Sequence, residues 1–185
     1  MNTDEQIVGI VKCGGNKGMG LMVSRYGQYI FAMIARQVGD LMDAEELTQD
    51  TFIRAFSHIG SYDPKRASLA TWLSRIAYRL TLDFLKRHRP FIASIDDTEV
   101  WQTDISDEQI AAELSTGNED RIQRLQSLMD ELPPDERLLL TLHYFENRPL
   151  SECAFIMDST SHALANRLYR IRLKLYKKLK QYDKL

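Results

Sequence analysis

The sequence predicts an all-α protein in which a linker joins two small helical domains. Hydrophobic residues recur at helical spacing along most of the chain, and few segments alternate apolar and polar residues as strands do. The chain has 185 residues, which is long for one small helical domain and suits two. Pro90 ends the first block of helical pattern, because the residue before a proline disfavours helix. We expect domains at residues 1–89 and 121–185 and a linker at residues 90–120.

The first domain is predicted to hold a short helix, a glycine-rich turn and three longer helices. The turn lacks the GxxxxGK[ST] order of a phosphate-binding loop, and no strand precedes it. Asp43 followed by Glu46 has the spacing of a capping box, which places a helix start at Asp43. In chain order the predicted helices cover residues 7–13, 21–38, 43–59 and 68–87.

The linker and the second domain follow a similar helical pattern with clear interruptions. Residues 90–120 are rich in Asp, Thr and Ser, and a short helical turn is predicted at residues 106–114. Residues 150–157 and 161–179 have helix-turn-helix spacing, and Thr160 or Ser161 is placed to cap the second of these helices. The predicted helices of this domain cover residues 121–132, 135–145, 150–157 and 161–179.

Charge is segregated along the chain although the net charge is only −2. Residues 65–89 carry seven bases and one acid, and residues 161–185 carry eight bases and one acid. Residues 90–120 between them carry nine acids and no Lys or Arg. This asymmetry favours two polyanion-facing modules joined by a segment that does not bind polyanions. The alternative is that these blocks are ordinary charged helix surfaces.

Several functional classes lack support in the sequence. No apolar run reaches the roughly 18 residues of a membrane span, and the N-terminus lacks the pattern of a signal peptide. Cys13 and Cys153 form no CxxC pair, which argues against a disulfide framework and a cysteine-rich zinc site. The four histidines fall on separate predicted elements without HExxH spacing, so a small enzyme is a weak alternative. We expect a cytoplasmic protein without membrane insertion, catalytic residues, metal, cofactor or small-molecule substrate.

One face of the predicted helix at residues 43–59 is a candidate docking patch. Its apolar arc is expected to be core, and the opposite arc sets an isoleucine among acidic and amide side chains. From periodicity alone an ordinary solvated face explains this arc better. The candidate docking residues are Glu46, Gln49, Asp50 and Ile53.

The helix at residues 68–87 and the loop before it combine bases with aromatic rings. Cations neutralise phosphates and rings can stack on exposed bases, so this mixture suits nucleic acid. Trp72 is more often a core residue than a stacking one in such a pattern. The expected buried stripe is Leu69, Leu73, Ile76, Leu80 and Phe84. The candidate nucleic-acid contacts are Tyr62, Lys65, Arg66, Trp72, Arg75, Arg79 and Lys86.

The second helix of the predicted helix-turn-helix has a polar face suited to duplex DNA. In this motif the N-terminal residues of the second helix meet base edges, and Asn pairs with adenine. His162 and Asn166 are placed for bases, with Ala163 at the margin of the same face. Leu173 falls on this face without an explanation. A helical hairpin with a basic solvated face is the alternative. The candidate phosphate contacts are Arg167, Arg170 and Lys174.

Four stretches of the chain resemble bacterial sigma factors of the extracytoplasmic-function (ECF, group 4) type. Residues 43–56 read DAEELTQDTFIRAF and resemble the core-binding segment of sigma region 2. Residues 68–79 read SLATWLSRIAYR and resemble the promoter-melting helix that follows. Residues 132–145 and the run RLYRIR at 167–172 resemble region 4. The likeness extends over about residues 20–180 and includes no other sigma region, as in the ECF group.

This resemblance implies a function in transcription initiation, in which the polymerase performs the chemistry. The docking patch around Glu46 would bind core RNA polymerase, and the basic loop and helix from Tyr62 to Lys86 would open the −10 promoter element. The helix-turn-helix residues from His162 to Lys174 would read the −35 element. The acidic linker would run near the RNA exit path, and an anti-sigma factor is an expected partner.

A sigma-like adaptor that binds an anti-sigma factor without driving transcription is the alternative from another class. Such a mimic would need no phosphate contacts. The basic faces are nevertheless retained, and this favours the sigma factor. The residues concerned are Arg75, Arg79, Arg170 and Lys174.

Overall fold

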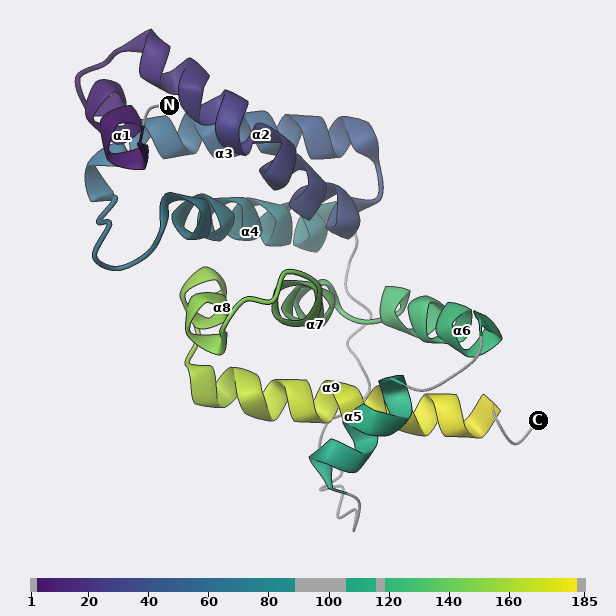
Figure 1. The fold of residues 1–185 in the computed structure, drawn as a ribbon. Helices are drawn as coiled ribbons and strands as arrows, with labels where there is room; N and C mark the ends of the chain where they lie inside the picture. Colours follow the sequence, from purple (N-terminus) through teal and green to yellow (C-terminus); the bar gives the residue numbers. More distant parts are fainter. Residues whose placement is uncertain (1–2, 89–105, 116–118, 183–185) are drawn as a thin grey trace. The chain divides into compact units, whose positions relative to one another are not determined.

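The computed structural model describes residues 3–88, 106–115 and 119–182. All regular secondary structure in these residues is helical, which confirms the predicted all-α class. The chain divides into two compact units (Figure 1). The first unit holds residues 1–90 together with Ala154–Ser159, and the second holds the remaining residues.

The first unit is a bundle in which three long helices pack on one another. α2 (Asn16–Val38) and α3 (Leu41–Ser57) each contact α4 (Leu69–His88) and also each other (Figure 1). α1 (Asp4–Lys12) packs on α2 and on the short 3-10 turn η1 (Ile59–Ser61). The large side chains that are fully buried in this bundle are Ile7, Met22, Ile30, Ile34, Leu69 and Leu73.

The start of α3 differs from the predicted capping box. Gly39 ends α2 in the left-handed conformation, with a φ of 81°, which glycine adopts without steric cost. Asp40 then caps α3, because its Oδ1 accepts from the backbone N–H of Met42 at 2.7 Å and of Asp43 at 3.2 Å. The prediction of a cap at Asp43 is therefore wrong, and the helix begins two residues earlier.

The buried face of α4 is broader than the predicted stripe. Leu69 and Leu73 are buried as expected, but Ile76, Leu80 and Phe84 are only half-buried. The reason is that α4 packs against both α2 and α3, so small polar side chains also enter the interior. Ser74 shows how they are accommodated, since its hydroxyl lies 3.0 Å from that of Tyr29. The other residues buried on α4 are Thr71, Trp72, Ala77, Tyr78, Thr81 and Leu85.

In the second unit several helices pack on the long helix α9 (Ser161–Tyr182). They are α5 (Asp107–Ser115), α6 (Glu119–Asp130) and α7 (Pro134–Leu140). α7 continues into a π-helical turn, η2 (Thr141–Phe145). α8 (Leu150–Met157) precedes α9 in the chain, and its residues from Ala154 onward belong to the first unit. The predicted core stripe of α9 is confirmed, because each of its members is buried: Leu164, Leu168, Ile171, Leu175 and Leu179.

The predicted linker contributes a helix to the second unit. α5 confirms the short helix expected at residues 106–114, whereas residues 89–105 and 116–118 lie outside the described part of the chain. Ile110 of α5 is fully buried, and α5 packs on α9. Leu173, which periodicity placed on the exposed face of α9, is buried. The structure thus gives α9 a second apolar contact that the sequence pattern did not explain.

Candidate docking and nucleic-acid surfaces

The outer face of α3 carries the four predicted docking residues together. Glu46, Gln49, Asp50 and Ile53 are all exposed, and Ile53 leaves 62% of its surface in contact with water. The opposite face of the helix supplies the core of the bundle through Ala44, Leu47, Thr51, Phe52 and Ala55. The helix is therefore held rigidly from behind while its mixed acidic and apolar face stays open.

The loop before α4 is an ordered turn that presents two bases. Asp63 organises it, because its Oδ1 accepts from the Lys65 N–H at 2.9 Å and its carbonyl accepts from the Arg66 N–H at 3.1 Å. Ser68 caps α4 by accepting from the backbone N–H of Thr71 at 3.2 Å. The side chains of Lys65 and Arg66 are exposed beside this cap, where they are accessible to an anion.

The two aromatic residues predicted to contact nucleic acid form the floor of this loop. Tyr62 and Trp72 are each only 8% exposed, and their ring centroids lie 5.5 Å apart. Burial is also the main cause that raises the pKa of Tyr62. Each ring covers the other because the loop folds back onto α4. In this structure neither ring offers a face for base stacking, so the two rings support the loop from below.

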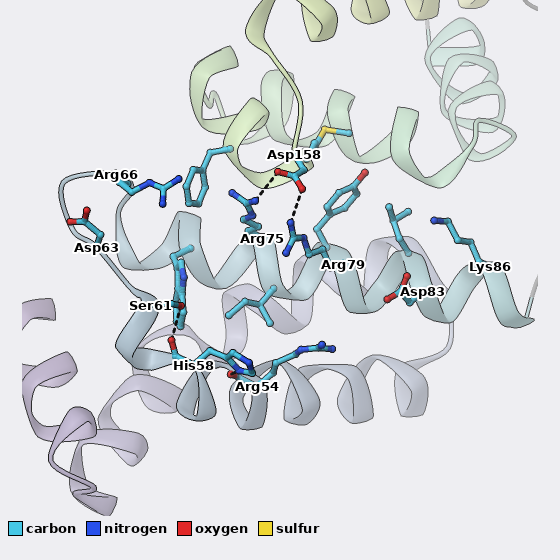
Figure 2. A pocket seen from close by; sticks show the side chains of 16 residues that line it. Arg54, His58, Ser61, Asp63, Arg66, Arg75, Arg79, Asp83, Lys86 and Asp158 are labelled. Atoms are coloured by element: carbon cyan, nitrogen blue, oxygen red, sulfur yellow. Dashed lines mark hydrogen bonds and ion pairs between the residues drawn. The ribbon is translucent and has the colours of Figure 1, made fainter.

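The bases of α4 line a cleft of about 700 Å³ in the first unit. Figure 2 shows Arg75, Arg79 and Lys86 along one side of it and Arg54 with His58 of α3 along the other. The Arg75 guanidinium also lies 4.8 Å from the centre of the Phe155 ring. The sixteen residues that line the cleft include five Arg or Lys and three Asp, together with apolar and aromatic side chains such as Phe155 beside Arg75.

One carboxylate, that of Asp158, engages two of these arginines. Arg75 Nη2 lies 2.7 Å from its Oδ1, and Arg79 Nη2 lies 2.6 Å from its Oδ2 (Figure 2). The hydrogen bond from Arg79 and the charge of Arg75 lower the pKa of Asp158. Two guanidiniums held this way can grip two oxygens of a single anionic group, which is also the requirement for binding a phosphate. Sequence reasoning missed this contact, because Asp158 lies 83 residues after Arg75 and 79 residues after Arg79.

The first turns of α9 present the residues predicted for base contacts. His162, Ala163, Asn166 and Arg170 are all exposed. Thr160 caps the helix by accepting from the Ala163 N–H at 3.1 Å, as one of the two predicted caps. The helix-turn-helix therefore offers an ordered helix start with polar side chains on its outer face.

His162 and Asn166 form a hydrogen-bonded pair on this face. The Asn166 Nδ2 lies 3.2 Å from His162 Nε2, and an amide nitrogen is the donor in such a contact. This contact orients the amide and turns its oxygen away from His162. The arrangement presets Asn166 for a bidentate contact of the kind that amides make with adenine.

Two residues predicted as phosphate contacts, Arg167 and Lys174, hold α7 in place. Arg167 forms an ion pair with Asp135, and Lys174 Nζ lies 3.8 Å from Glu136 Oε2. Their acidic partners lie in the first turn of α7, where negative charge also suits the helix dipole. The cationic charge that α9 directs outward from its first turns therefore comes mainly from Arg170.

Within the described residues, no three His, Cys, Asp or Glu side chains gather as a metal site would require. Among the helices in these same ranges, none combines the length and the apolar character that crossing a membrane would need.

Two helical units, a helix-turn-helix and two basic surfaces define a DNA-binding protein of the helix-turn-helix class. Comparison with protein families gives a more specific assignment. Residues 22–91 match the model of sigma-70 region 2, and residues 122–175 match that of sigma-70 region 4. The chain belongs to the sigma-70 family of RNA polymerase sigma factors, in its ECF group, which confirms the sequence prediction.

Similar proteins agree with this assignment along the whole chain. The ECF RNA polymerase sigma factor SigW of Bacillus subtilis is 28% identical over 175 residues, which cover 92% of this chain and 93% of SigW. The solved structure of CnrH in complex with the cytosolic domain of CnrY has a TM-score of 0.64 at 23% identity. It covers 97% of this chain and 99% of CnrH. The sigma factor RpoE of Bartonella quintana, solved with the anti-sigma factor NepR, has a TM-score of 0.57 at 19% identity and covers 90% and 99%.

Proposed function

We propose that this sigma factor directs core RNA polymerase to promoters through three separate surfaces. The outer face of α3 binds the polymerase, the loop and basic face of α4 bind the −10 element, and the first turns of α9 bind the −35 element. The proposed organisation is region 2 at residues 1–89, the linker at 90–120 and region 4 at 121–185. The observation that carries this proposal is the pair of arginines on α4 that grips one anionic group.

The polymerase-binding surface combines charge with an apolar contact. The polar side chains of Glu46, Gln49 and Asp50 fix where the partner sits along the helix. The exposed Ile53 supplies apolar area that is buried on binding. Because the other side of α3 is locked into the bundle, binding here requires little ordering of the helix.

For the −10 surface, the basic residues divide between loop and helix. Lys65 and Arg66 project from the ordered turn, while Arg75, Arg79 and Lys86 follow along α4. We assign phosphate contacts to these five residues, with Arg75 and Arg79 exchanging Asp158 for phosphate, and assign Tyr62 and Trp72 to the support of the loop. Opening the duplex costs a few kcal/mol per flipped base, which backbone contacts and a pocket for the base must offset.

The −35 surface separates base reading from phosphate binding. The His162–Asn166 pair is placed for base edges, with Ala163 beside it, and Arg170 is placed for phosphate. Arg167 and Lys174 reach DNA only if they exchange their partners on α7 for phosphates.

An anti-sigma factor is a proposed partner of this chain. The support is a fold shared with a sigma factor solved together with one. The chain itself supplies no catalytic residue in this proposal, because the polymerase forms the RNA bonds, and it acts in the cytoplasm where the polymerase works. The adaptor alternative has less support, because both basic surfaces are retained.

Run-off transcription with purified core polymerase tests the proposal. Templates would include the region upstream of the protein's own gene, and the readout is a transcript that depends on the added chain. The control is the double variant Arg75→Ala/Arg79→Ala, which should still bind core polymerase but give little transcript. Core binding without a transcript from any template would instead support the adaptor.

A further inference from the structure

The outer face of α3 continues beyond the four predicted docking residues to Met42. At about 100° per residue, Met42, Glu46, Gln49 and Ile53 fall within an arc of about 60°. Met42 is 74% exposed, more than any other large hydrophobic residue in the described ranges. Its position is ordered, because Asp40 accepts a hydrogen bond from its backbone N–H at 2.7 Å.

This stripe has an apolar residue at each end and polar residues between them. Met42 and Ile53 are eleven residues apart, which is about 16 Å along a helix. Packing within the bundle explains neither side chain, because both project into water. Large apolar side chains that stay exposed on a rigid helix are typical of sites where another protein binds.

We propose that Met42 is the second apolar anchor of the polymerase-binding surface. The inference rests on the proposed function of α3, and continuity along a single helical stripe identifies core polymerase as the occupant. Leu41 provides a contrast within the same helix. It is 64% exposed, but it lies about 100° around the helix from Met42 and outside the stripe.

A matched set of single variants tests this anchor. Met42→Gln, Leu41→Gln and Ile53→Gln each replace an exposed apolar side chain with a polar one, and the full chain is titrated against labelled core polymerase. Met42→Gln and Ile53→Gln should each weaken binding about tenfold, or about 1.4 kcal/mol. Leu41→Gln should leave affinity within about twofold, and circular dichroism checks that every variant keeps its helices.

The outcomes separate this inference from the proposed function. If Ile53→Gln weakens binding and Met42→Gln does not, the anchor is refuted while the docking surface stands. If Leu41→Gln and Met42→Gln weaken binding equally, the stripe does not define the contact and the inference fails. If no variant changes the affinity, the docking surface on α3 itself is wrong.

A second, independent inference concerns the buried Leu173 of α9. Leu173 is 3% exposed, yet it lies about 160° around the helix from the centre of the core stripe. The ion pairs and hydrogen bonds that α9 makes with Glu131, α7 and η2 lie at least about 100° around the helix from Leu173. They involve Arg167, Arg172, Lys174 and Lys178. α5 also packs on α9 and carries the fully buried Ile110, which makes α5 the candidate to cover Leu173.

The covered surface continues the face that is proposed to read DNA. Leu173 follows Asn166 by seven residues, which is about 10 Å along the helix and about 20° around it. Arg170 and Lys177 flank Leu173 on this side. The helix that lies here comes from the segment with nine acids and no Lys or Arg.

We infer that α5 is a detachable cover that competes with duplex DNA for this half of α9. In this inference Ile110 and Leu173, which are both buried, hold α5 on α9, and the exposed Glu108 of α5 repels approaching phosphates. DNA that reaches beyond Asn166 must displace α5. The free chain therefore binds duplex more weakly than it would if α5 did not cover α9. This inference rests on the proposed −35 surface.

Hydrogen exchange on the unaltered chain tests the displacement directly. A short duplex of mixed sequence at low salt is a suitable probe, because phosphate contacts are independent of sequence. Saturating duplex should lower the protection of α5 amides while those of α6 keep theirs. Unchanged protection of α5 in a chain whose α9 is bound by duplex would overturn the inference. A chain that does not bind duplex at all would instead refute the −35 surface.

Two matched substitutions add a measurement of affinity. Ile110→Ala shortens the buried anchor of α5, and Ile122→Ala shortens a side chain on α6 that is 53% exposed. Ile110→Ala should bind the duplex about fivefold more tightly, and Ile122→Ala should not change the affinity. Equal affinities for Ile110→Ala and the unaltered chain, with helix content preserved, would count against the cover.

Discussion

His162 and Asn166 act as one unit on the first turns of α9. Their hydrogen bond of 3.2 Å holds the amide in place before DNA arrives. The side chain therefore loses less conformational entropy when it contacts a base. Arg170, one turn further along, is exposed and suited to a phosphate, because its charge does not depend on the base sequence. The structure thus supports different roles for residues that the sequence could only place on one face.

Substituting Asn166 and Arg170 separately should divide specificity from general affinity. Arg170→Ala should weaken duplex binding on all sequences and reduce the slope of log K against log salt by about one. Asn166→Ala should relax the preference for the correct base by about 1–3 kcal/mol while keeping the salt slope.

Binding to matched and mismatched duplexes over a range of salt concentrations measures both effects. His162→Ala serves as a further probe, since it removes the partner that orients Asn166, and its effect should not add to that of Asn166→Ala. If Arg170→Ala and Asn166→Ala changed specificity and salt slope alike, the proposed division of roles would be incorrect.

Among the elements, α1 shows how a polar contact ties a helix to the bundle. Asp4 accepts from Arg25 at 2.6 Å and from the Tyr26 hydroxyl at 2.7 Å, both on α2. Burial, followed by the hydrogen bond to Asp4, raises the pKa of Tyr26 from 10.0 to about 12. Asp4 lies before residue 22, where the region 2 match begins, whereas Arg25 and Tyr26 lie within the matched segment, so the junction ties α1 to that segment.

Tyr26→Phe should reveal this junction in the pH dependence of stability. The raised pKa means that Tyr26 stays protonated in the folded chain after it ionises in the unfolded chain. Its contribution is therefore fully present below pH 10 and is lost as the pH rises towards about 12. Urea unfolding of the variant should show about 1 kcal/mol lower stability at neutral pH and a smaller loss above pH 10. If the unaltered chain and Tyr26→Phe lost the same stability above pH 10, Tyr26 would not contribute to the alkaline loss of stability.

Across the whole molecule, basic and acidic residues lie in different places although the net charge is only −2. Basic residues concentrate on the proposed DNA surfaces of the two units, and acids concentrate in residues 90–120 and on the outer face of α3. A chain arranged in this way has little overall attraction for DNA, because its basic surfaces are balanced by acids elsewhere.

The free chain should therefore bind promoter duplex weakly at physiological salt. Addition of core polymerase should increase apparent affinity by at least about a hundredfold, because simultaneous engagement of two linked modules raises the effective concentration of the second. Fluorescence anisotropy of a labelled promoter, measured with and without core polymerase, gives both values. Tight and promoter-specific binding by the chain alone would contradict this expectation.

Much of this protein follows from sequence pattern. Helical periodicity, the proline breaks and the charge blocks predict the all-α class and the buried stripe of α9, because these depend on local spacing along one helix. Two runs that resemble sigma regions 2 and 4, in the right order, identify the family. The exposed arc of α3 is predicted for the same reason.

Only the tertiary structure decided which residues on these helices face water. Tyr62 and Trp72 are buried because a loop folds back, and α4 buries a wide arc because two helices pack on it. Asp158 reaches Arg75 and Arg79 from far along the chain, and Leu173 is buried although helical periodicity places it on the exposed face of α9. Each depends on contacts between segments distant in sequence, and helical periodicity describes only how the side chains of a single helix are arranged.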